Sequence, residues 1–484
     1  MSIQGPLGAA ARARLQRALV AVVGADGVLA DAADLRVYEC DGYTIERSVP
    51  ALVVLPRTTD EVARVVRLAA EAEVAFVPRG AGTGLSGGCL PGEAPLMICT
   101  SRMRRIRMLD VANRRVVAEA GVVNATVSRA VRDAGLYYVP DPSSQNACTI
   151  GGNVAENSGG PHTLKYGVTT NHVLGVELVL ADGEVVELGG VIEDTPGYDL
   201  TGVVCGSEGT FGIVTAATLR LEPLPEAVTT LLAVFETVAA ATATVSRIIA
   251  AGIVPAALEM MDRTIVEAIE AAYHAGFPTD AGAVLIIELD GPAAGLPALA
   301  ARVEELCRVG GMRSVRTAAD EAERAAIWKS RKRAFGAVGR LSPSYCTQDG
   351  VVPRTRLPEI LMRIEEIGAR YGLRIGNVFH AGDGNIHPVI LFDERDRAET
   401  ARVLSAGREI LAACVALGGS ITGEHGIGVE KIRELGLSFG PDDLALMRRL
   451  RGVFDPAGRA NPGKIFPTAA GCTEQRAPRR QAAL

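Results

Sequence analysis

The residues best suited to chemistry are three histidines and one glutamate in the C-terminal half of the chain. His380 and His387 enclose Ala-Gly-Asp-Gly-Asn-Ile, whose glycines and Gly-Asn turn exclude a helix, so the loop can bring both imidazoles to one centre. Glu424 and His425 lie in a second glycine-rich turn. Two histidines and a carboxylate suit zinc, manganese or iron(II), with coordination positions left open for a substrate. Loop histidines that are only hydrogen-bonded remain the alternative.

A cationic segment precedes these residues. Arg331 lies in a stretch of helical periodicity together with Lys332 and Arg333. A guanidinium there can bind a substrate carboxylate through two parallel hydrogen bonds. A solvated basic helix face is the alternative, and the spacing alone favours it. Asp141 and Glu208, both in glycine-rich loops, are suited either to orienting a cofactor or to capping turns.

The first of three glycine-rich segments, residues 78–88, is typical of phosphate binding. It reads Pro-Arg-Gly-Ala-Gly-Thr-Gly-Leu-Ser-Gly-Gly and follows a short apolar stretch. The match to Gly-x-Gly-x-x-Gly is weak, because Pro91 and Gly92 exclude the helix that a Rossmann fingerprint opens and residues 104–107 are Arg-Arg-Ile-Arg instead of acidic. A strand–loop–strand nest of backbone N–H groups for a pyrophosphate is favoured. A plain surface turn is the alternative.

Two further glycine-rich segments span residues 140–167 and 206–214. The longer one has hardly any apolar periodicity, which predicts a long loop. A loop of that length inside a compact domain is usually functional or disordered. A strongly patterned hairpin at 176–188 follows at once, so we expect a functional loop.

The elements around these segments change character along the chain. An apolar strand at 52–55, a capping box at 58–61 and a strand at 74–77 predict a β-α-β unit that ends in the first glycine loop. Pro223 and Pro225 mark a domain boundary. Beyond it, strands and helices alternate in an α+β pattern: strands at 231–235, 284–289 and 373–379, and helices at 238–251, 293–309 and 355–371.

Composition excludes several classes of function. The chain has 484 residues, enough for two or three domains, and no apolar run approaches the ~20 residues of a membrane span. Its net charge is −6 and only 4% of residues are aromatic, without a basic block, which argues against nucleic-acid binding. The nine cysteines form no Cys-x-x-Cys pair, which argues against an iron–sulfur cluster. We expect a cytoplasmic protein.

Taken in order, the three glycine segments, His380 and His387, Glu424-His425-Gly426 and Asn461-Pro462-Gly463-Lys464 resemble flavoproteins of the vanillyl-alcohol-oxidase/PCMH family. Within that family the chain is similar to the 2-hydroxyacid dehydrogenase branch, and most to the FAD-binding subunits of bacterial glycolate oxidases. The resemblance covers residues 20–467 approximately.

The resemblance implies an α+β fold of two domains. Residues 1–225, with a core at about 48–225, would form a PCMH-type FAD-binding domain of two α/β subdomains. Residues 226–425 would form a cap domain with an antiparallel sheet flanked by helices, and 426–467 would return to the FAD domain. The polar, Arg-rich tail 468–484 is predicted to be disordered.

The implied cofactor is FAD. No histidine lies between residues 78 and 92, where such enzymes commonly attach the flavin, so noncovalent binding is expected. The residues that the resemblance assigns to the cofactor are Arg79, Gly80, Ala81, Gly82, Thr83, Gly84, Leu85, Ser86, Gly87, Pro142, Ser143, Ser144, Thr149, Gly151, Gly152, Asn153, Gly159, Glu208, Gly209, Gly212, Ile213, Val214 and Lys464.

The resemblance also assigns the catalytic groups. It matches His380, His387 and Glu424 to ligands of a divalent metal (zinc, manganese or iron), His425 to the base beside the reacting carbon, and Arg331 to the substrate carboxylate. In 2-hydroxyglutarate enzymes a lysine stands where this chain has Thr347, and an asparagine stands where it has Val389. The loss of these two polar groups favours a shorter substrate such as glycolate or lactate.

The implied reaction is hydride transfer from a short 2-hydroxy acid to flavin N5. Electrons would then pass to companion subunits, one of them an iron–sulfur protein, and on to membrane quinone, so that only these partners would tie the chain to the inner membrane. A stand-alone D-lactate or D-2-hydroxyglutarate dehydrogenase is the first alternative. The others are a non-catalytic FAD-binding assembly subunit and a metal hydrolase, which would leave the glycine segments unexplained.

Overall fold

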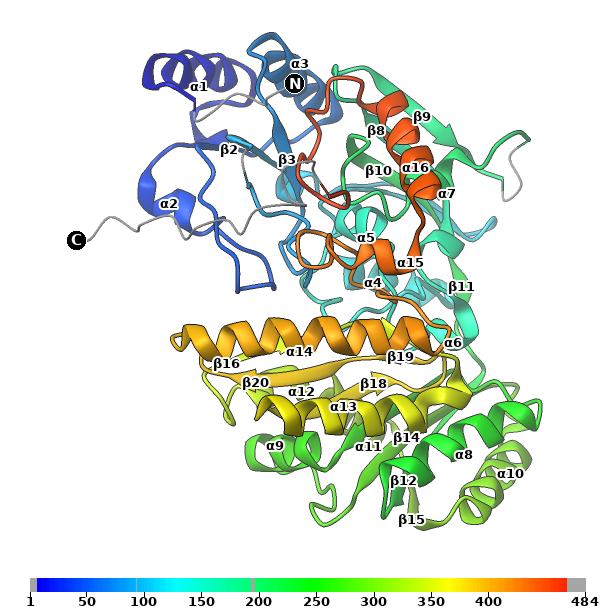
Figure 1. Cartoon of the computed structure of the whole chain (residues 1–484). Coiled ribbons are helices and arrows are strands. Elements are labelled where there is room, and N and C mark those ends of the chain that lie inside the picture. The colour runs from blue at the N-terminus through cyan, green and yellow to red at the C-terminus, as the bar shows by residue number, and fades with distance from the viewer. Residues whose placement is uncertain (1–6, 93, 193–195, 468–484) are drawn as a thin grey trace.

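The computed structural model describes residues 7–92, 94–192 and 196–467, which form two halves that meet across a layer of loops (Figure 1). Two sheets lie in the upper half of that view, and one large sheet lies in the lower half. The tail that the sequence predicts to be disordered, 468–484, lies outside the described residues.

The first sheet contains the predicted β-α-β unit, formed by β2 (Leu52–Val54), α3 (Thr59–Glu71) and β3 (Phe76–Arg79). Thr58 caps the helix by accepting the N–H of Glu61. Strand β4 (Leu96–Cys99) lies between β2 and β3 and runs parallel to both. The first glycine loop therefore begins at the carboxyl end of a parallel strand. Strand β1 (Val28–Leu29) completes the sheet, next to α1 (Ala9–Val23) and α2 (Ala32–Arg36).

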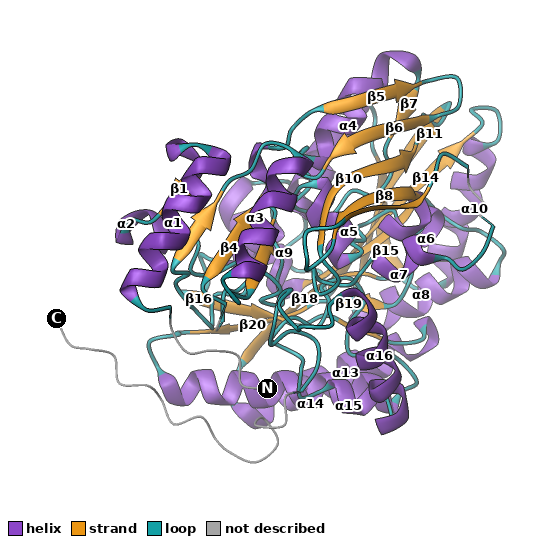
Figure 2. Ribbon diagram, turned by 90° about the horizontal axis from the view of Figure 1, so that it is seen from above, coloured by secondary structure: helices purple, strands orange, loops and turns teal. Residues whose placement is uncertain are grey.

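The second sheet is antiparallel and contains five strands. Seen from above, it lies beside the first sheet (Figure 2). In order, its strands are β5 (Ile106–Asp110), β6 (Arg115–Glu119), β10 (Ile213–Arg220), β8 (Val173–Val179) and β9 (Val185–Gly189). The predicted hairpin is β8 and β9. Helices α4 (Asn124–Val131) and α7 (Leu200–Val204) and the short ladder of β7 (Leu136–Tyr137) with β11 (Glu222–Pro223) complete this part.

The prediction of one long loop over residues 140–167 is wrong. This segment contains the helices α5 (Ile150–Glu156) and α6 (Thr163–Tyr166). Helix α5 lacks an apolar period because two of its seven residues are glycine. A Cβ on Gly151 would lie 2.7 Å from the Cβ of Ala120, so glycine is what allows the helix to approach the strand behind it.

One antiparallel sheet of nine strands forms the centre of the lower half. The main path is β15 (Met312–Thr317), β12 (Ala227–Phe235), β14 (Ala283–Gly291), β13 (Ala257–Asp262), β18 (Arg374–His380), β19 (Asn385–Ile386) and β17 (Gly350–Val351). Strand β20 (Pro388–Phe392) pairs with β18 and with β16 (Ser344–Thr347).

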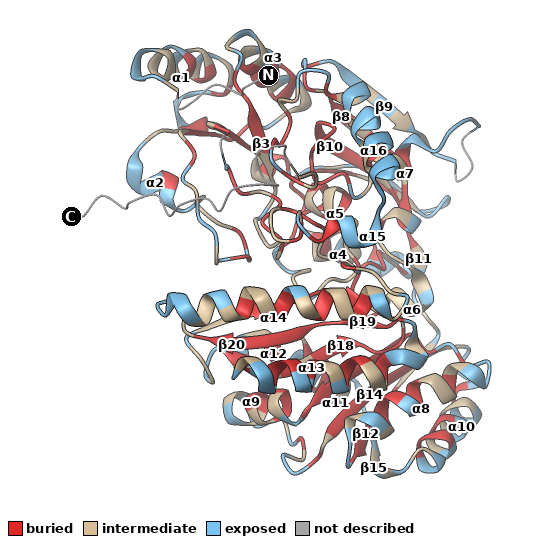
Figure 3. Cartoon of the chain, viewed as in Figure 1, coloured by how far each residue is buried: buried red, intermediate tan, exposed pale blue. Residues whose placement is uncertain are grey.

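Helices cover both faces of this sheet, which explains why β13, β14 and β20 read as largely apolar runs and are almost fully buried, whereas the edge strand β15 is not (Figure 3). One face carries α8 (Val238–Ala250), α10 (Leu296–Val309), α13 (Leu357–Tyr371) and α14 (Arg397–Ala416). The other carries α9 (Arg263–Tyr273), α11 (Glu321–Lys332) and α12 (Ala334–Val338).

Two glutamates interrupt the apolar strands of the sheet. Glu259 on β13 is opposite Ile286 and Glu288 on β14 is opposite Ala257, so both carboxylates project on the same face, toward α11. The exposed fraction is 0% for Glu259 and 2% for Glu288. Buried carboxylates need charged or hydrogen-bonding partners, so these two positions indicate where the polar networks of the lower half begin.

The C-terminal segment lies against the upper half (Figure 1). It contains α15 (Leu435–Ser438) and α16 (Pro441–Phe454), and Phe454 stacks on Phe211 with ring centroids 4.5 Å apart. Backbone hydrogen bonds from residues 459–461 to Phe76 add this segment to the edge of β3.

Candidate active site

A cavity of about 370 Å³ lies between the two halves, and residues of all three glycine segments line it together with residues of the lower half. The predicted cofactor residues that line it are Arg79, Gly80, Ala81, Gly82, Thr83, Gly84, Leu85, Pro142, Ser143, Ser144, Thr149, Gly151, Gly152, Asn153, Glu208, Gly209, Gly212, Ile213 and Val214. The predicted catalytic and metal residues that line it are Arg331, His380, His387, Glu424 and His425. Segments far apart in the sequence thus meet in one space.

Four predicted cofactor residues lie outside this cavity. The carbonyl of Ser86 accepts the N–H groups of Val429 and Glu430, and Gly87 is next to Val429, so both contact the C-terminal segment. Gly159 lines a smaller cavity beside Glu424. Lys464 is buried and donates to the carbonyl of Leu90, 2.7 Å away, and to the side chain of Asn461.

The walls formed by the glycine segments fit a dinucleotide. A Cβ on Gly80 would lie 2.4 Å from Thr149 Oγ1, so this wall admits only backbone. Thr149 Oγ1 and both polar atoms of the Asn153 side chain are buried without a hydrogen-bond partner among the described residues. Orphaned groups that line a cavity are suited to the phosphate and ring oxygens of a bound cofactor.

At the other end of the cavity, two imidazoles converge on one carboxylate. His380 Nε2 and His387 Nε2 each lie 3.2 Å from Glu424 Oε1, and one ligand atom of each residue lies within 4.8 Å of the others. His380 ends β18 and His387 follows β19, so the hairpin between them brings both rings to one place, as the sequence predicts. Donor type and convergence fit a divalent cation such as zinc, manganese or iron.

Glu259 orients one of these imidazoles. It is the cross-strand partner of His380, and its Oε1 lies 2.7 Å from His380 Nδ1, which leaves Nε2 directed at Glu424. Burial disfavours the imidazolium, but the charges of Glu259 and Glu424 outweigh burial and raise the pKa of His380 well above its usual range. Two carboxylates around one imidazole call for a cation, and a metal ion would supply it in place of the proton.

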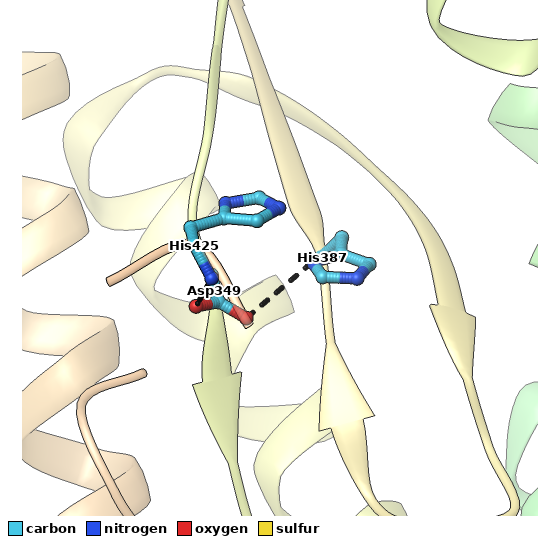
Figure 4. Close-up of side chains that lie close together, drawn as sticks. All are labelled: Asp349, His387 and His425. Carbon is cyan, nitrogen blue, oxygen red and sulfur yellow. Dashed lines mark hydrogen bonds and ion pairs between the residues drawn. The ribbon is translucent and has the colours of Figure 1, made fainter. Parts of the chain in front are cut away.

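Asp349 organises the turn that carries Glu424 and His425. Figure 4 shows its carboxylate beside the His387 ring and the backbone of His425. Its carboxylate accepts the N–H groups of residues 423, 424 and 425 and the hydroxyl of Thr422, and Lys431 Nζ lies 3.2 Å away. Burial opposes ionisation, but Lys431 and the nearby imidazoles hold the pKa of Asp349 well below its usual range. All of these bonds go to Oδ2, so Asp349 positions the turn. Its Oδ1 lies 3.9 Å from His387 Nδ1, within a second histidine–carboxylate cluster that also includes His425.

His425 is stacked on His387, with ring centroids 4.9 Å apart and planes 6° from parallel. Burial lowers the pKa of His425 to about 4, and its Nδ1 has no hydrogen-bond partner among the described residues. The ring is therefore neutral at pH 7 and is able to accept a proton.

Arg331 is buried, which excludes the solvated basic face for this residue. Its exposed fraction is 1%, whereas Arg333 is exposed. Arg331 Nη2 lies 2.6 Å from Glu259 Oε2, yet none of its nitrogens has an aligned hydrogen-bond partner among the described residues. A buried guanidinium with unused N–H groups in a cavity wall is suited to an anionic ligand.

Comparisons with known proteins agree with this geometry. The profile of the FAD binding domain matches residues 50–189, and that of the C-terminal domain of FAD linked oxidases matches residues 224–465. The chain belongs to the FAD-linked oxidases. The prediction of an FAD-dependent enzyme is thereby confirmed.

Individual relatives are more specific. Glycolate oxidase subunit GlcD of Escherichia coli is 46% identical over 90% of this chain and 88% of its own length. A D-lactate dehydrogenase of Anaerostipes hadrus is 33% identical over 86% of this chain and 89% of its own. The solved structure of p-cresol methylhydroxylase has a TM-score of 0.80 at 17% identity and covers 95% of this chain and 97% of its own, which confirms the predicted fold.

In this FAD-linked oxidase, the two positions that depart from the 2-hydroxyglutarate enzymes are neighbours. Thr347 on β16 is the register partner of Val389 on β20, so the side chains lie on the same face of the ladder. Thr347 lines the cavity and its hydroxyl has no hydrogen-bond partner among the described residues, whereas Val389 is fully buried.

Sequence reasoning missed one charged network at the cavity. His162, whose spacing gave no signal, lies 2.9 Å from Asp141 Oδ1 through Nδ1 and 3.2 Å from Glu288 Oε1 through Nε2. Lys332 Nζ is 3.0 Å from Asp141 Oδ2. We call Asp141, His162, Glu288 and Lys332 the clasp, because it joins the two halves. A glutamate within the apolar run of residues 283–289 was the available signal.

Within the described ranges, no helix is both long enough and apolar enough to cross a lipid bilayer.

Proposed function

We propose that this protein oxidises a short 2-hydroxy acid, glycolate first, to its 2-oxo acid with noncovalently bound FAD as the hydride acceptor. One observation supports the proposal most. A single cavity is lined by the glycine segments, by the imidazole–carboxylate cluster and by Arg331, which is buried and whose N–H groups have no hydrogen-bond partner among the described residues. Binding groups for a dinucleotide, for a carboxylate and for a hydroxyl-activating cation then face one another.

Each group has a separate role in this proposal. Arg331 binds the substrate carboxylate, and its ion pair with Glu259 fixes the guanidinium in place. His380, His387 and Glu424 hold the cation, which polarises a bound hydroxyl. His425, neutral because it is buried, takes the hydroxyl proton on a ring nitrogen. Bound FAD supplies the two-electron acceptor for the hydride of the α-carbon.

The roles divide along the chain as the resemblance implies. Residues 1–225 with 426–467 serve the cofactor, and residues 226–425 serve the substrate. The remaining predicted cofactor residues, Ser86, Gly87, Gly159 and Lys464, act indirectly by fixing the loops that carry the cavity walls.

The wall near Thr347 supports a short substrate in this proposal. A dicarboxylic substrate needs a second cation, and the pair Thr347 and Val389 offers none. Lys332 lines the cavity, but Asp141 neutralises it. Glycolate is placed before D-lactate because the glycolate oxidase subunit is 46% identical and the D-lactate dehydrogenase 33%. D-lactate is the second candidate, since that relative also covers most of the chain.

In this proposal, the reduced flavin passes its electrons to a partner protein. The glycolate oxidase relatives are named as subunits, which supports companion chains. The sequence has no cysteine set for an iron–sulfur cluster, so we assign that cluster to a companion subunit and any contact with the inner membrane to the complex. Rapid reoxidation of the isolated chain by air, at the rate of turnover, would argue against this assignment.

An anaerobic titration tests the substrate. Purified FAD-loaded protein is mixed with glycolate, D-lactate, L-lactate or D-2-hydroxyglutarate while the absorption of oxidised flavin is followed, and metal content is measured on the same sample. We expect bleaching with glycolate at the lowest concentration and none with D-2-hydroxyglutarate. If no 2-hydroxy acid bleaches the flavin, the proposed reaction is wrong and the role of an assembly subunit gains support.

Variants separate the two principal roles. Arg331→Lys keeps the charge but not the two-pronged geometry, so we expect KM for glycolate to rise by about 10- to 100-fold. His425→Ala removes the base and should lower kcat by about 10²–10⁴-fold with FAD still bound. Turnover of the His425→Ala variant close to that of the native enzyme would exclude His425 as the base.

A further inference from the structure

One acidic residue in the cavity wall has no part in the function proposed above. Glu156 ends helix α5 and lines the same cavity as the glycine segments. Its Oε2 is buried and has no hydrogen-bond partner among the described residues. The residue as a whole is half-buried, because it borders the cavity. A carboxylate with one buried oxygen that lacks a donor is destabilised as an anion, so its protonation state depends on its neighbours.

The neighbouring charge that most disfavours ionisation of Glu156 belongs to a second glutamate, Glu208. A methyl group placed on Gly426 would lie 2.7 Å from Glu156 Oε2 and 2.8 Å from Glu208 Oε1, so the two carboxylates flank the same glycine. Glu208 accepts the N–H groups of Ile427 and Gly428, both at 2.7 Å. Burial raises the pKa of Glu208 above its usual range, and these two donors oppose that rise. Of the two carboxylates, Glu208 is therefore the one better suited to ionise, and its charge then disfavours ionisation of Glu156.

Among the described residues, Lys431 and Lys464 offset this arrangement only in part, because each has another partner. Lys431 is committed to Asp349, 3.2 Å away, and Lys464 donates to the carbonyl of Leu90 at 2.7 Å. A third acid, Asp41, lines the cavity as well and adds to the negative field. Burial first, and then the charges of the other acids, raise the pKa of Glu156 well above its usual range. Geometry and charge agree in favouring the protonated form of Glu156.

A neutral carboxylic acid in a cavity wall is a hydrogen-bond donor. Gly426 directly follows His425, and a Cβ on Gly88 would lie 2.5 Å from Glu156 Oε1, so Glu156 lies between the first glycine segment and the end of the cavity that holds the proposed base. The redox-active ring of the flavin has to reach that end for hydride transfer. Two-electron reduction adds negative charge to this ring, so a donor there interacts more strongly with the reduced form than with the oxidised form.

We propose that Glu156 stays protonated beside ionised Glu208 and donates a hydrogen bond to the bound flavin, which stabilises the reduced cofactor. This inference rests on the proposed position of the flavin ring beside His425. It does not rest on the identity of the substrate, because reduction by dithionite or by an electrode needs no hydroxy acid.

The test is the midpoint potential of the FAD-loaded protein, measured without substrate by equilibration with a reference dye. Glu156→Gln keeps a neutral donor, and we expect the equilibrium constant for reduction to change by less than about twofold. Glu156→Leu removes the donor and should shift that constant about tenfold toward the oxidised form, about 30 mV for two electrons. Glu187→Gln, an exposed position on β9, is the matched control and should leave the potential unchanged.

Other results of these measurements would overturn the proposal. If Glu156 is ionised, Glu156→Gln removes a negative charge and shifts the constant about tenfold or more toward the reduced form. If its proton faces the diphosphate or no ligand, Glu156→Leu leaves the potential unchanged. Infrared difference spectra of the native protein test the proposal even if one of the variants does not bind FAD. The carbonyl stretch of a protonated carboxylic acid should shift on reduction, and this band should be absent in Glu156→Gln. A spectrum without that band contradicts the proposal directly.

Discussion

The large sheet carries two buried glutamates on one face, and comparing them separates a structural cluster from a functional one. Both contact a histidine and an arginine, and both arginines lie on α11. Both carboxylate oxygens of Glu288 have several hydrogen-bond partners, so we call this glutamate saturated. Arg324 donates to both oxygens, and Thr230, Trp328 and His162 contact them as well. Glu259 has an ordinary hydrogen bond to His380 only, and Arg331 beside it keeps N–H groups unused. Unsatisfied donors around a buried charge are what mark the site for ligands.

The two histidines differ in the same way. His162 gives each ring nitrogen to a different carboxylate, Asp141 in the upper half and Glu288 in the lower, so it joins the two halves. The interaction with both carboxylates raises the pKa of His162 to about 10 although burial opposes it. His380 instead shares one oxygen of Glu424 with His387, which is the convergence that a metal ion requires. A proton completes the first cluster, and a metal ion is expected to complete the second.

The largest effect should come from removing the shared oxygen. Glu424→Gln keeps the volume but loses the anionic ligand, so bound divalent metal should fall from about one per chain to near zero and kcat/KM by about 10³-fold. Metal analysis and steady-state kinetics on one preparation measure both. Glu288→Gln is the matched control in the clasp, and its metal content should equal that of the native protein. Full metal content in Glu424→Gln would exclude the assigned ligand set.

A smaller effect on metal binding is expected from Glu259, which contacts the ligand His380. Glu259→Gln leaves the three ligands in place but weakens the bond that fixes the His380 ring, so metal affinity should fall about 10- to 100-fold. Competition with a coloured chelator measures this affinity independently of turnover. An unchanged affinity would show that Glu259 serves only Arg331, in which case the loss should be confined to KM for the acid.

The clasp should affect substrate binding more than metal binding. Asp141 directly precedes the cavity residues 142–144, and Lys332 directly follows Arg331, so His162→Gln loosens both walls. We expect KM for glycolate to rise about tenfold, equivalent to about 1.4 kcal/mol, with a smaller change in kcat and normal metal and FAD content. His274→Gln, a histidine outside both clusters, is the control. Loss of metal in His162→Gln would show that the two clusters are one network.

The stability that His162 contributes should depend on pH with a defined sign. Its pKa is raised from 6.5 to about 10, so its contribution is complete below pH 6.5 and is lost as pH rises through 10. Its partner Asp141 has a pKa lowered from 3.8 to about 2, so that contribution is lost only as pH falls through 2. The difference in Tm between the native protein and His162→Gln should therefore be largest near pH 4–6.5 and should shrink by pH 10. A difference that grows above pH 7 would contradict the assigned charges.

The part of the site that the sequence predicts is the part whose partners are close in the chain. The glycine segments, the hairpin between His380 and His387 and the turn at Glu424 are local patterns, and each was found at the cavity. Glu259 and His162 were missed because their bonds to His380 and Glu288 span 121 and 126 residues, and only the fold brings them together. The same holds for the fold: apolar runs predicted the buried strands, but helix α5 was missed because its glycines pack through backbone contact and leave no apolar period.

The smallest effect tests whether the clasp is saturated. Trp328→Phe removes the indole N–H that Glu288 accepts but keeps a ring near His162, whose centroid is 5.5 Å from that of Trp328. Because Arg324 and Thr230 still donate to Glu288, the loss should be about 1 kcal/mol of stability, with metal content and KM unchanged. A double-mutant cycle with Glu288→Gln isolates the hydrogen bond from the lost volume, and a coupling energy of about 0.5–1.5 kcal/mol is expected. A coupling several times larger would mean that Glu288 depends on each donor, as Glu259 does, and that the contrast between a saturated and an unsaturated glutamate is wrong.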